Sequence, residues 1–212
     1  MMVKICGITN REDALAAVEA GASALGFNFY RDSPRYISPT GASMIAAKIP
    51  STVWRVGIFV NETPEIISRI ALDTGLDVAQ LHGTSEARGI RIWRAIPADE
   101  SLLAYIKDED VDAVPANESL WTHANDENAE AVLVDTPSDA LHGGTGASFD
   151  WSRAKGLPKH IIIAGGLDAS NVRRAIEEAQ PWGVDACSRL EKSPGLKDHD
   201  KVREFVKAAL QS

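Results

Sequence analysis

The chain has 212 residues, with 22 Lys and Arg against 30 Asp and Glu, a formal net charge of −8 at pH 7. This acidic balance argues against a nucleic-acid or anionic-membrane surface, because both attract Lys and Arg, but it permits a small anionic ligand. No apolar run approaches the roughly 18 residues of a membrane span, and we expect no signal peptide. Two cysteines, Cys6 and Cys187, are too few for a disulfide framework or a zinc site, so we expect a reducing, cytoplasmic compartment.

Short β-rich runs alternate with helical patterns along the chain. Strands are predicted at 2–6, 24–29, 53–60, 77–82, 91–96, 131–135, 160–164 and 183–187. Helices are predicted at about 11–20, 40–48, 63–74, 84–89, 99–107, 149–154, 168–180 and 198–210. The expected helix starts are Thr9 or Asn10, Thr63, and Asp168 or Ser170, and the expected ends are Gly21 and Gly75.

The strict alternation predicts a parallel sheet, here a single (β/α)8 TIM barrel over residues 1–212. Eight units leave about 26 residues each, which is lean for this α/β fold. The alternative is a doubly wound open sheet, which usually shows a glycine-rich phosphate fingerprint after its first strand. Cys6-Gly7-Ile8-Thr9 follows instead. Residues 97–129 are the least clear part, and we favour a solvated helical face with a turn over an extra excursion.

Polar side chains are predicted to gather at one end of this barrel. Helix-facing positions should be apolar, so Val3 and Ile5 leave Lys4 and Cys6 pointing inward. The same reasoning directs inward the side chains of Gln80, His82, Arg94, Asp135, Asp185 and Cys187. Most of these lie at or near the carboxyl ends of their strands, where such barrels carry the active site. For any single residue, a purely structural polar network is the alternative.

Glycine-rich turns after the late strands indicate a phosphate site. Gly165-Gly166 follows the seventh strand and Ser188 the eighth, the usual phosphate position of this fold. Gly143 and Gly144 follow the sixth strand and belong either to this site or to a mobile flap over it. Arg35, in the loop after the second strand, is either an exposed loop residue or a fork for a substrate carboxylate.

Several motifs together carry a family resemblance. They include Lys4-Ile5-Cys6-Gly7-Ile8-Thr9, Arg55-Val56-Gly57-Ile58-Phe59-Val60-Asn61, Gln80-Leu81-His82-Gly83, Leu133-Val134-Asp135-Thr136 and Ala164-Gly165-Gly166-Leu167, with Val184-Asp185, Pro194-Gly195 and Lys197-Asp198 near the end. With them, the chain resembles phosphoribosylanthranilate isomerases of tryptophan biosynthesis over nearly its full length. The resemblance implies a TIM barrel without metal or cofactor that performs an Amadori rearrangement of N-(5-phosphoribosyl)anthranilate.

The resemblance also implies residue roles. Cys6 matches the general base, Asp135 the general acid and Arg35 the residue that holds the anthranilate carboxylate. The turns after strands seven and eight match the phosphate loops. We therefore expect the substrate to be bound by Arg35, His82, Asp185, Gly143, Gly144, Gly165, Gly166 and Ser188.

The proposed chemistry sets two protonation requirements. Asp135 must be protonated to donate to the ribose ring oxygen, and burial would raise its pKa. Cys6 must be a thiolate to take the C2 proton, although a free thiol with a pKa of about 8.5 is mostly protonated at neutral pH. We hypothesise that Lys4 or the bound substrate lowers the pKa of Cys6.

Two features depart from or go beyond the family. The usual Ser-Ser-Gly after the last strand reads Cys187-Ser188-Arg189 here. If that glycine needs a positive φ, Arg189 is strained; otherwise it brings a cation to the phosphate. Because strands one and eight are neighbours in a closed barrel, Cys6 and Cys187 come within the span of a disulfide, and we predict that oxidation could cross-link them and inactivate the protein reversibly.

Other functions are weighed against this one. A related sugar-phosphate isomerase of histidine biosynthesis would show two half-barrel repeats and paired aspartates, and this chain has Cys6 where the first would lie. A non-catalytic barrel should have lost one of Cys6, Arg35 or Asp135, and a thiol redox role lacks a Cys-x-x-Cys pair. We expect a small phosphorylated substrate, no nucleic-acid or membrane partner, and a monomer rather than a homodimer.

Overall fold

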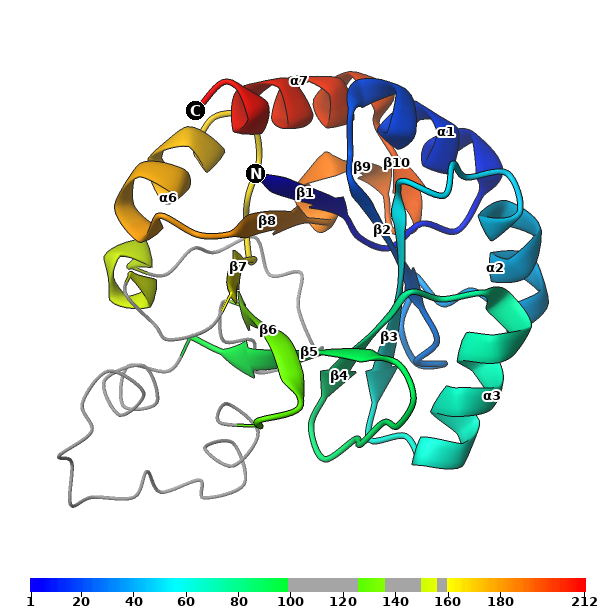
Figure 1. Ribbon diagram of the computed structural model, residues 1–212. Coiled ribbons are helices and arrows are strands. Elements are labelled where there is room, and N and C mark those ends of the chain that lie inside the picture. The colour runs from blue at the N-terminus through cyan, green and yellow to red at the C-terminus, as the bar shows by residue number, and fades with distance from the viewer. Residues whose placement is uncertain (99–125, 136–149, 156–159) are drawn as a thin grey trace, which may run out of the picture.

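The computed structural model describes residues 1–98, 126–135, 150–155 and 160–212. Eight parallel strands close into a barrel in their chain order (Figure 1). They are β1 (Met2–Ile5), β2 (Ala24–Asn28), β3 (Trp54–Val60), β4 (Val78–His82), β5 (Arg91–Pro97), β6 (Ala129–Asp135), β7 (His160–Ile163) and β8 (Gly183–Ala186). Pairing of β1 with β8 closes the ring, which confirms the predicted TIM barrel.

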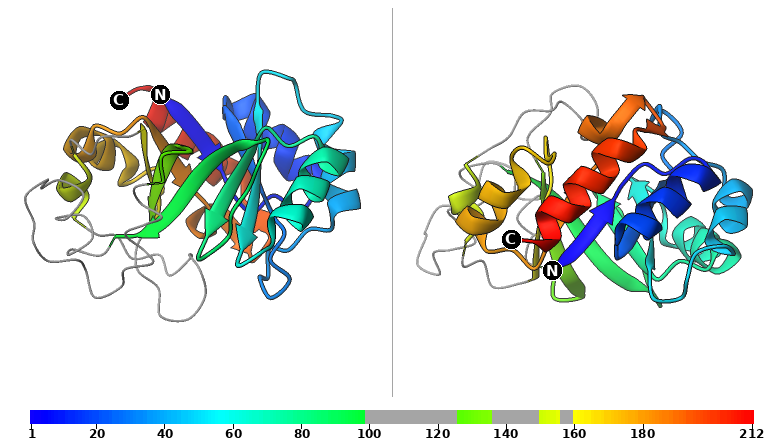
Figure 2. Two further views of the ribbon diagram at one scale, coloured as in Figure 1. Left: turned by 60° about the horizontal axis from the view of Figure 1, so that its bottom comes forward. Right: turned by 90° about the horizontal axis from the view of Figure 1, so that it is seen from above.

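Helices cover the outside of the barrel in the described ranges (Figures 1 and 2). They are α1 (Arg11–Ala20), α2 (Pro39–Ala46), α3 (Pro64–Thr74), α6 (Val172–Ala179) and α7 (His199–Leu210), with 3-10 turns η1 (Trp151–Ala154) and η2 (Ser188–Leu190). Side chains of Asn10 and Thr63 cap the starts of α1 and α3 by accepting backbone N–H bonds. Gly21 and Gly75 end the same helices in the left-handed conformation, as predicted.

Two apolar clusters separate the inside of the barrel from its helical cover. Strand residues form the inner cluster, which contains Met2, Ala24, Val56, Val78, Trp93, Ala131, Leu133, Ile162 and Ala164. Trp54 and Trp182 pack against Trp93, with ring centroids 5.6 and 5.9 Å from it. Val3 and Ile5 belong to the outer cluster, as predicted, so Lys4 faces inward.

Some local predictions are wrong. Residues 84–89 form turns and bends instead of a helix, and Gly83 and Gly89 at their ends have φ of 64° and 72°. Asn171, not Asp168 or Ser170, is the N-cap of α6, because the Asp168 carboxylate accepts the Ser170 N–H in a turn before it. A short antiparallel pair, β9 (Glu191–Ser193) and β10 (Leu196–Lys197), follows η2 and is not predicted from the sequence. The helix expected at 99–107 lies outside the described residues.

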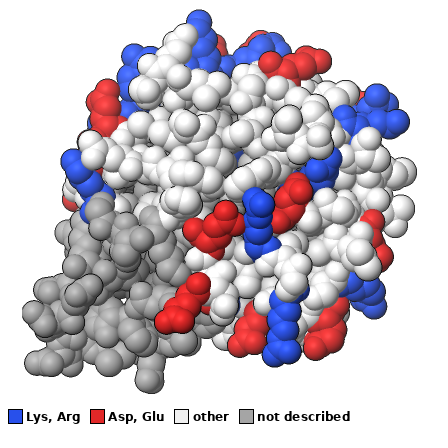
Figure 3. Space-filling view, in the orientation of Figure 1, with Lys and Arg blue, Asp and Glu red and all other residues white. Residues whose placement is uncertain are grey.

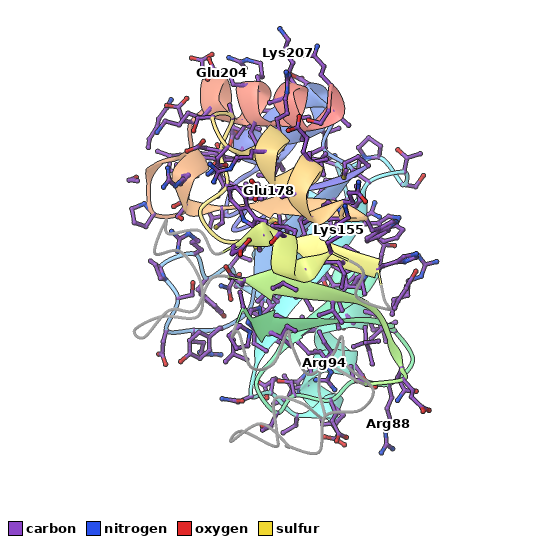
Figure 4. All side chains as sticks on the ribbon, turned by 90° about the vertical axis from the view of Figure 1, so that its left-hand side faces the viewer. Arg88, Arg94, Lys155, Glu178, Glu204 and Lys207 are labelled. Atoms are coloured by element: carbon purple, nitrogen blue, oxygen red, sulfur yellow. The ribbon has the colours of Figure 1, made fainter. Side chains whose placement is uncertain are left out.

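Arg94 does not point into the barrel, which corrects its predicted direction. Trp93 fills the interior, and Arg94 lies on the other face of β5, across the barrel from α7 (Figure 4). Its Nε donates to Asp126 Oδ2 at 2.8 Å and its Nη1 to the carbonyl of Ser85. Apolar residues occupy both faces of β5, so the alternation of polar and apolar residues could not show which face points into the barrel.

This buried pair predicts a stability effect. We expect Arg94→Met to lower the free energy of unfolding by about 3 kcal/mol, because it breaks an ion pair whose two side chains are both largely buried. Urea unfolding of wild type and variant measures the change. Arg203→Met is the matched control, since its pair with Asp200 is exposed and should contribute under about 0.5 kcal/mol. Equal losses in both variants would contradict the prediction.

The visible face of the molecule carries charges of both signs. On the face shown in Figure 3, basic and acidic side chains are interspersed and do not segregate by sign. None of the helices in the described ranges has the length and apolarity needed to cross a membrane.

Candidate functional site

A cavity opens where the strands end at their carboxyl termini. It is lined by Cys6, Gly7, Asn28, Ser33, Arg35, Ile58, Gln80, His82, Leu133, Asp135, Ala164, Gly165, Gly166, Leu167, Asp185, Cys187, Ser188 and Arg189. Every predicted site residue in the described ranges is among them. Gly143 and Gly144 lie outside those ranges.

A buried ion pair lies beneath the cavity. Lys4 on β1 and Asp185 on β8 are register partners, and Lys4 Nζ lies 2.9 Å from Asp185 Oδ1. Burial opposes the charge of Lys4, but attraction to Asp185 and Cys6 outweighs it and raises the pKa of Lys4. The two residues therefore form a neutral unit that ties β1 to β8.

Arg35 is not an exposed loop residue. Its Nε and Nη2 donate to Glu191 Oε1 and Oε2 at 2.9 and 2.8 Å, a bidentate pair. Lys197 Nζ donates to the same Oε1 at 3.0 Å. Burial of Glu191 opposes its charge, but the bonds from Arg35 and Lys197 lower its pKa below the ordinary value. These three side chains are called the cation cluster below.

Sequence reasoning does not identify two members of this cluster. Glu191 and Lys197 lie on the unpredicted pair β9 and β10, and nothing in their local pattern links them to a loop more than 150 residues earlier. The one available signal is the motif around Pro194-Gly195 in the family resemblance.

The two cysteines meet beside this cluster. Both are free thiols, and Cys6 donates a hydrogen bond to Cys187. Gly7 makes the close packing possible, because its φ is 73° and a Cβ there would lie 2.9 Å from Cys187 Sγ and 2.8 Å from Arg35 Cδ. The predicted proximity of the thiols is therefore present, and a disulfide between them stays a prediction.

The surroundings shift the pKa values of the two thiols in opposite directions. The hydrogen bond to Cys187 and then burial raise the pKa of Cys6 well above its ordinary value. Lys4 acts in the hypothesised direction, but its effect is outweighed. The hydrogen bond from Cys6 lowers the pKa of Cys187 to about 6 against the effect of burial, with help from Lys197 and Arg35.

The turns after β7 and β8 form a further part of the cavity lining. Gly165 and Gly166 line the cavity and have φ of 82° and 64°, a conformation that favours glycine and lets a ligand approach the backbone closely. Asn171 holds the turn by donating to the Gly166 carbonyl at 2.8 Å and accepting from the Asp168 N–H at 2.9 Å. This geometry is suited to an anion.

Arg189 is unstrained. The non-glycine residues with positive φ in the described ranges are Asn61 and Gln180. Arg189 Nη1 donates to Asp168 Oδ2 at 2.9 Å, which joins the turns after β7 and β8. Its guanidinium therefore places a cation at the rim beside Ser188.

Asp135 and His82 complete the cavity. Asp135 is the last residue of β6 and is half-buried, and β7 and β8 separate it from Cys6 after β1. His82 Nε2 lies 2.9 Å from Gln80 Nε2. No group of three or more His, Cys, Asp or Glu side chains is placed to hold a metal ion, within the ranges that the structure describes.

Comparisons with known proteins agree on one family. The family described as N-(5'phosphoribosyl)anthranilate (PRA) isomerase matches residues 3–208. N-(5'-phosphoribosyl)anthranilate isomerase of Solibacter usitatus is 45% identical, over 99% of this chain and 97% of that protein. The phosphoribosyl anthranilate isomerase structure from Thermotoga maritima is 36% identical, with a TM-score of 0.82 and full coverage of both chains. Another isomerase structure, solved with reduced 1-(o-carboxyphenylamino)-1-deoxyribulose 5-phosphate, is 35% identical with a TM-score of 0.78 and full coverage of both chains.

Proposed function

The chain belongs to the N-(5'-phosphoribosyl)anthranilate isomerase family, and from that premise we propose which of its side chains carry the reaction. It catalyses the Amadori rearrangement of N-(5'-phosphoribosyl)anthranilate to 1-(o-carboxyphenylamino)-1-deoxyribulose 5-phosphate in tryptophan biosynthesis. Asp135 is the general acid and Cys6 the general base, acting from two sides of one cavity.

The reaction needs a proton delivered and a proton removed. Asp135 gives its proton to the ribose ring oxygen, and the ring opens to a Schiff base between C1 and the anthranilate nitrogen. The Cys6 thiolate then removes the C2 proton, which leaves an enolamine that tautomerises to the ketone. Each such acid–base step contributes roughly 10²- to 10⁴-fold in rate.

Arg35 has donors to spare for the anthranilate carboxylate. A guanidinium carries five N–H donors, and the pair with Glu191 uses one on Nε and one on Nη2. The donors that are left lie on the Nη side, where a second carboxylate can dock. Glu191 thereby fixes the orientation of Arg35 without occupying all of it.

The phosphate lies between acid and base in this arrangement. β7 and β8 stand between β6, which carries Asp135, and β1, which precedes Cys6. Gly165, Gly166 and Ser188 offer backbone and hydroxyl donors there, and Arg189 adds a positive charge at the rim. His82 and Asp185 line the space left for the sugar.

One observation supports this assignment above others: acid, thiol and carboxylate-binding arginine line a single cavity beside a glycine turn. The test is to generate N-(5'-phosphoribosyl)anthranilate in situ and follow loss of its anthranilate-type fluorescence with and without the protein. We expect decay only with the protein. No decay with folded protein would shift weight to the histidine-pathway substrate or to a non-catalytic barrel.

Substitution of Arg35 separates binding from turnover. We expect Arg35→Lys to raise KM about tenfold or more and to change kcat much less, because an ammonium cannot bond two carboxylates bidentately. Steady-state kinetics measures both constants. Arg55→Lys is the control, since Arg55 pairs with Asp77 outside the cavity and should leave KM unchanged. A fall in kcat alone would contradict a binding role.

We propose further that residues 1–212 form one domain that acts as a monomer in the cytoplasm. The large apolar residues exposed in the described ranges, Met1, Met44, Leu72, Leu196 and Leu210, come from different elements and do not support a broad dimer surface. The two adjacent free thiols, one of which is the proposed base, favour a reducing compartment. Light scattering after size-exclusion chromatography tests the first point, and the related Thermotoga maritima protein is described as dimeric.

A further inference from the structure

The cation cluster carries one positive charge too many. Arg35 and Lys197 are both cations, whereas Glu191 is the one carboxylate that pairs with them in the ranges that the structure describes. Lys197 is fully buried and Glu191 nearly so. A buried charge without compensation is costly, so a further anion is expected beside Lys197.

The other charged groups around the cluster do not supply it. Lys4 and Asp185 neutralise each other across β1 and β8. Asp13, on α1, accepts from the Lys197 backbone N–H and lies 2.8 Å from His199 Nε2. Lys201, on α7, is another cation, and its Nζ donates to the Glu191 carbonyl.

The side chain in place to balance the charge is Cys187. Its Sγ lies 3.7 Å from Lys197 Nζ, and the same Nζ donates to the Cys187 carbonyl at 3.1 Å. Cys6 is its neighbour, because Ile5 and Ala186, which precede the two cysteines, are register partners on β1 and β8. A thiolate at Cys187 would therefore accept from a buried ammonium and from a thiol.

We propose that Cys187 is a positioning residue for the base. The two thiols share one proton, and in the resting protein the negative charge lies on Cys187 beside Lys197. Cys187 accepts the Cys6 proton when Cys6 acts as the base. This inference rests on the proposed role of Cys6. It also goes beyond that role, since it makes the base a pair of thiols held by the cation cluster. The low pKa of Cys187 and the high pKa of Cys6 agree with this placement.

The protons balance in this scheme. In the resting protein Cys6 is S–H and Cys187 is S⁻. Transfer of the Cys6 proton to Cys187 creates the Cys6 thiolate, which removes the C2 proton of the substrate. The pair then holds one proton more and Asp135 one fewer, and exchange with water restores both.

Thiolate absorbance at about 240 nm tests the placement directly. The chain has two cysteines, so each single variant reports one thiol. We expect wild type to show one thiolate titrating near pH 6. Cys6→Ser should keep a thiolate that forms below pH 8, and Cys187→Ser should lose this low-pH step. Retention of the step in Cys187→Ser would overturn the proposal, because the charge would then belong to Cys6.

The pH profile separates this role from a packing role. In wild type kcat/KM should rise with pH through about 6, where Cys187 becomes a thiolate, and in Cys187→Ser this rise should move to the range of a free thiol, about pH 8.5. A loss equal at every pH would mean that Cys187 serves packing alone and would overturn the proposal. Lys201→Met is the matched control, since it removes a nearby charge that contacts neither thiol and should leave the thiolate midpoint unchanged.

The same experiments distinguish failure of the proposed function. If Cys6→Ala kept wild-type activity, Cys6 would not be the base, whatever the titration showed. If Cys6→Ala were inactive but no thiolate appeared near pH 6 in wild type, Cys6 would be the base, and the proposal that it shares a proton with Cys187 would be wrong.

Discussion

Cys6→Ala is expected to lower kcat by at least about a hundredfold at neutral pH. The alanine removes the proposed acceptor of the C2 proton and leaves the other cavity residues in place. Binding should change little, because neither the cation cluster nor the glycine turn depends on the Cys6 side chain for its bonds. The fluorescence assay under saturating substrate gives kcat, and the thermal midpoint verifies that the variant is folded. Turnover within a few-fold of wild type would remove Cys6 from the mechanism.

Cys6→Ser sharpens this test. Serine is close in size and keeps a hydrogen-bond donor for Cys187, but its hydroxyl does not ionise in the working pH range. We therefore expect a loss as large as that of Cys6→Ala. A serine variant with substantial activity would mean that a hydrogen-bond donor, and not a thiolate, is what the site requires.

Asp135→Asn is expected to lower kcat by at least about a hundredfold as well. The amide has the shape of the carboxyl group but cannot transfer its proton to the ring oxygen, so ring opening becomes slow. Asp77→Asn is the matched control, because Asp77 pairs with Arg55 outside the cavity and its loss should leave kcat within about twofold. Comparable activity in both variants would contradict the role of Asp135.

The strands could be predicted closely because their signals are local. Each strand of the barrel is a short apolar run bounded by turn residues, and β1, β6 and β8 each show one clear apolar face. That pattern placed Cys6, Asp135 and Asp185 at the right end of the barrel. The pattern failed for Arg94, because β5 has apolar residues on both faces. It also failed for residues 84–89, because the glycines at the ends of this segment have positive φ and no helix forms between them.

The partners of the site residues could not be predicted, because they are distant in sequence. Glu191 orients Arg35 across 156 residues, and no periodicity connects them. The pKa of Cys6 also depends on the distant Cys187 and on burial more than on the nearby Lys4. Local patterns therefore located the reactive groups but not the groups that set their protonation.

The seam between β1 and β8 ties catalysis to the order in which the chain is made. Lys4 and Cys6 precede Asp185, Cys187 and the pair β9 and β10 by about 180 residues in the chain. Contacts over such separations carry a large loop-closure entropy cost, which must be met before the contacts stabilise the fold. A nascent or truncated chain without its final segment would hold every residue of β1 to β6 and still have no paired thiol and no oriented arginine. Enzyme activity therefore requires that β8 has closed the ring against β1.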